Sequence, residues 1–148
     1  MNCNETNIAS LEKLESYNQF CENTLIGNLG IRYTYASDQR IEAEMPVDDR
    51  TIQPHGYLHG GASIALGETL AGLGSQRLCA EGEMAVGQQV TSLHVRPVKK
   101  GNRVKATATL FHKGRKTHIW NVEIMNMEGK SVSSIRVVNF IVKKNGDQ

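Results

Sequence analysis

A long apolar segment near the middle of the chain limits the possible folds more than any other feature of the sequence. The run GGASIALGETLAGLGSQ, from Gly60 to Gln76, follows a loop that contains Pro54 and Gly56, and it is expected to form a helix that begins near Gly60. Because this helix is apolar nearly all round, other parts of the chain should cover it on several sides. Its three interior glycines indicate that something approaches the helix backbone closely.

The only other large segments that could cover this helix are predicted strands, which lie before and after it in the sequence. Apolar and polar residues alternate over 30–36 and 40–46, around a turn that contains Ser37. The later turns contain Gly101, Gly114 and Gly129, and each is expected to need a residue at positive φ. We therefore predict an α+β fold in which a curled antiparallel sheet wraps around one central helix. The longer strands, rich in Val, Ile and Thr, are expected at roughly 84–96, 102–112, 116–126 and 130–142.

Length and composition fit one globular domain over residues 1–148. The chain has 39% hydrophobic residues and no break in composition, which is enough for one real core and leaves no room for a second domain. Residues 1–29 are expected to form an N-terminal arm with a short helix that Ser10 caps. One face of that helix would carry Leu11, Leu14, Tyr17 and Cys21. Trp120, Val122 and Ile124 are interpreted as core.

Charge and cysteine content exclude several classes of protein. The 17 basic and 15 acidic residues are interspersed and give a formal net charge of +2, which argues against an extended nucleic-acid or membrane-binding face. Cys3, Cys21 and Cys79 are odd in number, widely spaced and without a CxxC pair, so neither a disulfide framework nor a zinc site is indicated. The first residues lack the pattern of a signal peptide, and we expect a cytoplasmic protein without a metal.

Glu68 is the only charged residue between His59 and Arg77. An ionised carboxylate in a buried helix is unfavourable by several kcal/mol unless partners compensate, so its default reason is chemistry, and the alternative is a structural ion pair. The unpaired amides of Gly60 and Gly61 at the helix start can hold an oxyanion. Together these groups provide what the hydrolysis of an activated acyl group needs.

The spacing of these two groups predicts a dimer. At 1.5 Å per residue, the eight residues from Gly60 to Glu68 span about 12 Å along one helix. Reacting atoms should lie within roughly 3 to 3.5 Å of one carbonyl carbon. The Glu68 of one chain would therefore have to work with the helix start of another, in an obligate dimer with two shared sites.

The segment QPHGYLHGGASIALGETLAG from Gln53, with MPVDDRT before it and LCAEGE after it, resembles the hotdog-fold acyl-CoA thioesterases over nearly the whole chain. The resemblance is greatest to the branch with a catalytic Glu on the central helix, which includes 4-hydroxybenzoyl-CoA, phenylacetyl-CoA-pathway and 1,4-dihydroxy-2-naphthoyl-CoA thioesterases. It implies an aromatic acyl-CoA substrate and a place in menaquinone biosynthesis. It also implies a homotetramer built as a dimer of dimers, and no cofactor besides the CoA of the substrate.

The same resemblance implies roles for individual residues. Glu68 would be the nucleophile or general base, and the Gly60 amide would polarise the thioester carbonyl across the dimer interface. Gln53 would lie beside the carbonyl and the lytic water, His59 would support the oxyanion side, and His94 would line the aryl pocket. The expected substrate contacts further include Thr69, Gly72, Leu73 and, for the CoA phosphates, basic residues such as Arg96, Arg115 and Lys116. Gly72 departs from the family pattern, since relatives often carry Ser or Thr there.

Two other functions stay open at this stage. A hotdog dehydratase or hydratase would pair a loop histidine, here His59, with Glu68 across the dimer. A non-catalytic acyl-CoA-binding protein is the second alternative, but sensors of this kind normally carry a DNA-binding segment. Only about 28 residues precede the first strand, which is short for a winged helix, and they are not basic.

Overall fold

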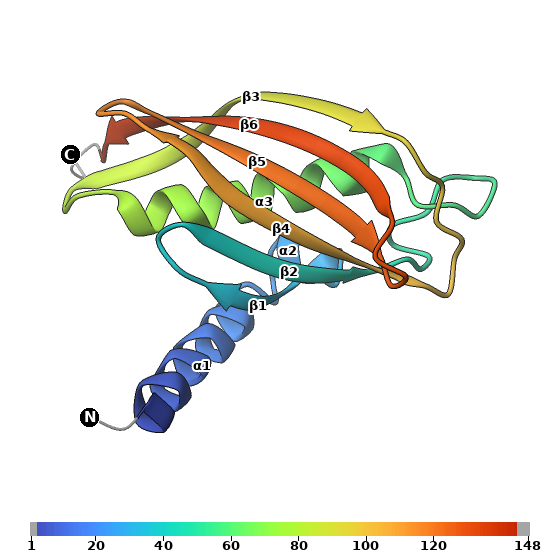
Figure 1. Cartoon of the computed structure of the whole chain (residues 1–148), viewed down its shortest axis with the longest axis horizontal. Coiled ribbons are helices and arrows are strands. Elements are labelled where there is room, and N and C mark those ends of the chain that lie inside the picture. The colour runs from blue at the N-terminus through green and yellow to red at the C-terminus, as the bar shows by residue number, and fades with distance from the viewer. Residues whose placement is uncertain (1–2, 145–148) are drawn as a thin grey trace.

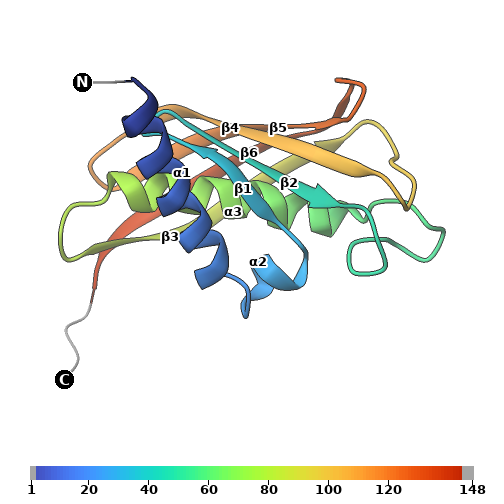
Figure 2. The same ribbon diagram turned by 90° about the horizontal axis from the view of Figure 1, so that it is seen from below.

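The computed structural model describes residues 3–144 and confirms the predicted architecture. One six-stranded sheet has the order β1-β2-β4-β5-β6-β3, with every neighbouring pair antiparallel, and the long helix α3 packs along one face of it (Figure 1). Seen from below, the curved sheet arches over α3, and α1 lies in front of them, on the side of the edge strand β1 (Figure 2). The elements are α1 (Cys3–Phe20), α2 (Leu25–Asn28), β1 (Arg32–Ala36), β2 (Arg40–Pro46), α3 (Gly60–Leu78), β3 (Glu83–His94), β4 (Arg103–Lys113), β5 (Thr117–Asn126) and β6 (Ser131–Lys143).

The N-terminal helix is longer than the sequence pattern predicted. Helix α1 extends back to Cys3, so the expected start after Ser10 is wrong, and the side chain of Leu11 lies outside the described residues. Leu14 packs against the core as predicted, whereas Cys21 is buried but lies just after the helix, in the turn that follows Phe20. The buried Asn18 side chain donates to the Tyr33 carbonyl at 3.0 Å and accepts from its amide at 2.9 Å, which ties the arm to edge strand β1.

The sheet covers only one side of α3. The expectation of cover on several sides is wrong within a single chain, because the buried residues recur every three or four positions and form one stripe. The opposite side carries Gly61, Ala65, Glu68 and Gly72, which are exposed or half-buried. This open stripe of α3 is therefore left largely uncovered by the sheet, although the Glu68 side chain reaches β3. The buried stripe consists of Ala62, Ser63, Leu66, Gly67, Leu70, Ala71, Gly74 and Ser75.

Two glycines of α3 allow the close approach that the sequence indicated. A Cβ on Gly67 would lie 3.0 Å from Ile135 Cδ1, and a Cβ on Gly74 would overlap the indole of Trp120. Trp120 is fully buried, and its Nε1 donates to Ser75 Oγ at 2.9 Å. Gly72 differs, since a Cβ there would meet nothing within 4 Å. The sheet therefore explains the first two glycines and leaves the third unexplained within the chain.

Two of the three predicted turn glycines have positive φ. Gly101 lies at φ 93° and Gly129 at φ 74°, but Gly114 has no positive φ, so that part of the prediction is wrong. In the β4–β5 turn a Cβ on Gly114 would lie 2.9 Å from His112 Nε2 and 3.0 Å from the Thr117 carbonyl oxygen. The glycine at this turn is thus needed for space and not for backbone conformation.

Strand β3 is the edge of the sheet nearest the open stripe of α3. It pairs only with β6, and its register shifts between Gly87 and Gln89, which marks a bulge. Most of its residues are exposed, whereas the other edge strand, β1, is contacted by α1. None of the helices in the described range is long and apolar enough to cross a membrane.

Candidate active site

The first turn of α3 leaves one backbone amide without a partner. His59 is the N-cap, and its Nδ1 accepts from the Gly61 amide at 2.8 Å. The His59 carbonyl accepts from the amides of Ala62 at 3.0 Å and Ser63 at 3.2 Å. Among the residues that the structure describes, the Gly60 amide has no hydrogen-bond acceptor. Because the positive end of the helix dipole lies here, this free amide is suited to bind an oxyanion.

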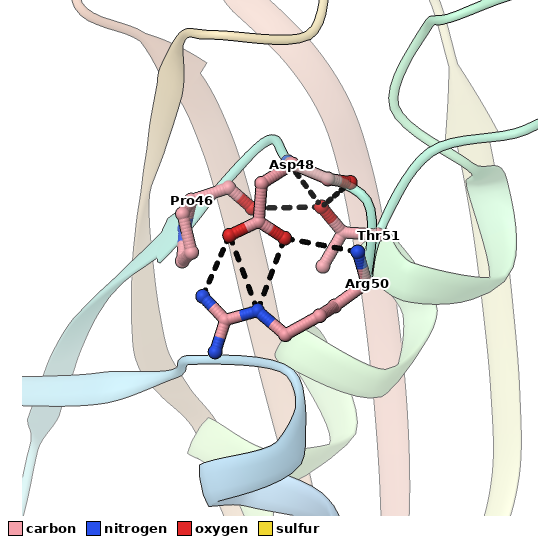
Figure 3. Close-up of polar contacts among 4 residues, drawn as sticks. All are labelled: Pro46, Asp48, Arg50 and Thr51. Atoms are coloured by element: carbon pink, nitrogen blue, oxygen red, sulfur yellow. Dashed lines mark hydrogen bonds and ion pairs between the residues drawn. The ribbon is translucent and has the colours of Figure 1, made fainter.

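The loop before α3 fixes the position of His59. Thr51, only 1% exposed, donates through its hydroxyl to the Pro46 carbonyl at 2.8 Å, and its own carbonyl accepts from the His59 amide at 2.8 Å. Arg50 binds the Asp48 carboxylate through Nε and Nη2 (Figure 3). These hydrogen bonds from Arg50 lower the pKa of the Asp48 carboxyl, against a smaller opposing effect of burial. The segment VDDRT (residues 47–51) thus holds the start of α3 in position through these hydrogen bonds.

A cleft of about 310 Å³ opens beside the Gly60 amide. The His94 ring packs against Gly60, since a Cβ on that glycine would lie 2.9 Å from His94 Nε2. A side chain at this position would displace the imidazole, which explains the glycine. The cleft is lined by Leu58, Gly60, Ser63, His94, Val95, Arg96, Pro97, Val132 and Ser133.

Glu68 is exposed, so the prediction that it is buried is wrong for one chain by itself. Its side chain stands on the open stripe of α3 and reaches β3, where a Cβ on Gly87 would overlap Glu68 Oε1. Within the described part of the chain it forms no ion pair or hydrogen bond, so no structural partner was found for it there. At 1.5 Å per residue it lies about 12 Å along α3 from Gly60.

The other predicted residues fall into two groups. Gln53 lies in the loop before α3 and turns its Oε1 back to accept from the His55 amide, so its carboxamide oxygen closes the local turn. Thr69 accepts at its carbonyl from the Tyr33 hydroxyl at 3.2 Å, and Leu73 packs against the core. The first group is thus Gln53, in the loop before α3. The second group is Thr69, Gly72 and Leu73, which lie on α3 itself.

The basic residues are not brought together in one chain. Arg96 lines the cleft beside Gly60, and its Nε donates to the Ser131 carbonyl at 3.0 Å. Arg115 and Lys116 lie in the β4–β5 turn, at the opposite end of the sheet (Figure 1). Strand β4 spans about 30 Å from one end of the sheet to the other. Arg115 and Lys116 of one chain therefore do not reach the Gly60 cleft of the same chain.

A second cleft, of about 330 Å³, lies between α2 and the ends of β1, β2 and β4. It is lined by three arginines, but each has a carboxylate partner. Arg32 pairs with Glu15 at 2.7 Å, Arg50 with Asp48 at 2.6 Å, and Arg103 with Glu44 at 3.4 Å. Because these pairs neutralise the positive charge, this cleft is a weaker candidate for an anionic ligand.

Two residues near the site, Gly87 and Ser133, were not predicted from the sequence. Gly87 interrupts a strand pattern, which is a signal for a bulge or a close contact. Ser133 occupies a position on β6 that faces the core and is 0% exposed, and its Oγ lies 2.8 Å from His94 Nδ1. A polar residue at a core position of an alternating strand is the signal that could have found it.

Comparisons with known proteins show which family and which fold this chain shares. Residues 55–133 match the thioesterase superfamily. A relative from Haemophilus influenzae is 43% identical over 117 residues, which covers 79% of this chain and 84% of the relative. The crystal structure of a thioesterase from Haemophilus influenzae is 39% identical with a TM-score of 0.83, covering 88% of this chain and 90% of that one.

A protein from Staphylococcus aureus has been solved as two alanine variants, and one of these structures is described as a thioesterase enzyme. Both are 36% identical to this chain. The Glu→Ala variant has a TM-score of 0.79 and covers 82% of this chain and all 100% of that one. The Gln→Ala variant has a TM-score of 0.77, with coverages of 81% and 98%. In that protein the substituted Gln and Glu lie fifteen residues apart.

Proposed function

The chain belongs to the thioesterase superfamily and has the hotdog fold of that family, and from this premise we propose that it hydrolyses acyl-CoA thioesters through Glu68. The observation that carries the proposal is the free Gly60 amide at the start of α3, which opens into the cleft beside His94. A thioester carbonyl bound there would gain negative charge at the point where the helix stabilises it best.

Glu68 and Gln53 are proposed as the reacting acid and the residue that holds the water. They are separated by fifteen residues, as are the Glu and Gln that were replaced in the Staphylococcus aureus protein. Glu68 forms no ion pair within the described residues, so no basic side chain there holds its carboxylate away from a substrate. Gln53 would have to exchange its bond to the His55 amide for the water or the substrate.

The site is proposed to form between two chains. The roughly 12 Å between Gly60 and Glu68 in one chain is too long for one carbonyl carbon, and Glu68 is exposed toward the unpaired edge of β3. A second chain that adds its own β3 to this edge would place two open stripes of α3 near each other. We further propose that two such dimers form a tetramer.

In the proposed reaction the Gly60 amide holds the carbonyl oxygen, and His59 keeps the neighbouring amide of Gly61 occupied as the helix cap. Glu68 of the other chain either adds to the carbonyl carbon and expels the CoA thiolate, or removes a proton from the water beside Gln53. The first route gives a mixed anhydride that water then opens, and the second gives the free acid directly.

The proposed substrate is an aromatic acyl-CoA such as 1,4-dihydroxy-2-naphthoyl-CoA, in menaquinone biosynthesis in the cytoplasm. His94, Thr69, Gly72 and Leu73 would contact the acyl group and the pantetheine arm. Arg96, which lines the Gly60 cleft, would meet a phosphate of the CoA bound to its own chain, whereas Arg115 and Lys116 would have to come from another chain.

The test combines a thiol-release assay on aryl, short-chain and long-chain acyl-CoA esters with chain complementation. Glu68→Gln and Gly60→Ala should each abolish most turnover, and the exposed control Glu81→Gln should keep it. A mixed dimer of one Glu68→Gln chain and one Gly60→Ala chain has one intact site, so it should recover about half of the wild-type rate. Near-normal turnover in Glu68→Gln would remove the mechanism, and a dead mixed dimer would remove the shared site.

A further inference from the structure

A buried hydroxyl lies directly behind the His94 ring. Ser133 is 0% exposed on the core face of β6, among apolar residues such as Val132 and Ile135. Its Oγ lies 2.8 Å from His94 Nδ1, and within the described chain this imidazole nitrogen is its only hydrogen-bond partner. A buried hydroxyl hydrogen needs an acceptor, because leaving it unpaired away from water is unfavourable.

This contact decides which nitrogen of His94 carries the proton. If Nδ1 were protonated, it would donate to Ser133 Oγ and leave the buried hydroxyl hydrogen without an acceptor. If Nδ1 is unprotonated, the hydroxyl donates to it, and both groups are satisfied. The neutral ring then carries its proton on Nε2.

The protonated nitrogen faces the helix start. His94 Nε2 lies beside Gly60, on the cleft side of the ring. Among the described residues, the one polar contact of Nε2 is with Ser92 Oγ at 3.5 Å, which is too long for a strong hydrogen bond. The Nε2–H group is therefore free to donate to an atom bound next to the Gly60 amide.

We infer that Ser133 is a positioning residue that holds His94 with Nε2–H directed into the Gly60 cleft, as a second donor to the thioester oxygen. The inference rests on the proposed function for its catalytic part. Two converging donors stabilise the charge of a tetrahedral intermediate better than one, provided that neither has to reorient during the reaction.

The first measurement reads the tautomer without substrate. Long-range proton–nitrogen NMR spectra of the ¹⁵N-histidine protein distinguish protonated from unprotonated ring nitrogens, and a His94→Gln variant assigns the signals. In spectra of the neutral ring, His94 should be protonated at Nε2 in the wild type and should become a tautomer mixture in Ser133→Ala. A wild-type signal from Nδ1–H would overturn the inference.

The second measurement is turnover in matched serine variants. Ser133→Ala should lower kcat by roughly ten- to a hundred-fold with little change in KM, since a donor used in the transition state is lost or misaligned. Ser133→Thr, which keeps the hydroxyl, should recover much of the rate. Ser134→Ala is the control, because the neighbouring serine lies on the outer face and bonds Glu123 instead. Unchanged kcat in Ser133→Ala, with or without an altered tautomer, would contradict the inference.

The two proposals fail in different ways. Loss of the proposed function would appear as normal turnover in Glu68→Gln, which leaves the His94 tautomer untouched. Failure of the present inference would appear in the NMR spectra or in Ser133→Ala while Glu68→Gln stays inactive.

Discussion

Replacing Gly74 by alanine should destabilise the protein by roughly 1–5 kcal/mol, although alanine is the better helix former by about 1 kcal/mol. A Cβ at this position would lie 2.6 Å from Trp120 Cη2 and 2.9 Å from Cε2, closer than real side-chain contacts allow. Overpacking of this kind usually destabilises a core by about 1–3 kcal/mol. Trp120 is fully buried and cannot move without weakening its 2.9 Å hydrogen bond to Ser75, and an unpaired buried donor adds about 1–3 kcal/mol.

The matched control lies two residues away on the same helix. A Cβ on Gly72 would meet nothing within 4 Å, so Gly72→Ala should stabilise the protein by up to about 1 kcal/mol through helix propensity. Both variants are compared by urea unfolding at one protein concentration, because association of chains would shift the midpoint. Wild-type or higher stability in Gly74→Ala, or equal shifts in the two variants, would refute the packing argument.

Two further predictions concern the edge of the sheet and the buried histidine. Gly87→Ala should lower kcat about a hundred-fold while leaving the unfolding midpoint nearly unchanged, because the new methyl group displaces the flexible Glu68 carboxylate by about an ångström; a wild-type rate in the thiol-release assay would contradict this. Burial, followed by the charge of Lys113, lowers the pKa of His118 below its usual 6.5, so the unfolded chain binds the proton more tightly than the folded one. Stability should therefore fall as the pH drops from about 7.5 to 5.5, and urea midpoints of His118→Phe should lack this part of the fall.

The fold was largely predictable because its signals are local. Alternation of apolar residues gave β1, β2 and the four later strands to within a few residues, and the apolar run gave α3 from its first residue. The length of α1 was not predictable from Ser10, since a residue that suits a cap is also tolerated inside a helix. Gly114 was misjudged because a glycine in a turn can serve either a positive φ or a close contact, and only the packing distinguishes them.

The candidate site was predictable in its residue types but not in its surroundings. The helix start at Gly60 and the acid at Glu68 follow from the one-dimensional pattern of charges and glycines. The exposure of Glu68 does not, because it depends on how much of α3 the sheet of one chain can cover. The support of His94 by Ser133 joins residues 39 positions apart, and such a contact is determined by the register of β3 on β6.

The pairing of β3 with β6 also has a consequence for synthesis on the ribosome. Strand β3 is made directly after α3, but its only neighbour in the sheet is β6, the last strand of the described residues. Until β6 has left the exit tunnel, the nascent chain has no place for β3, and the surface against which Glu68 rests does not exist. The earlier strands β1, β2, β4 and β5 can assemble first, so the Glu68 region should form after them.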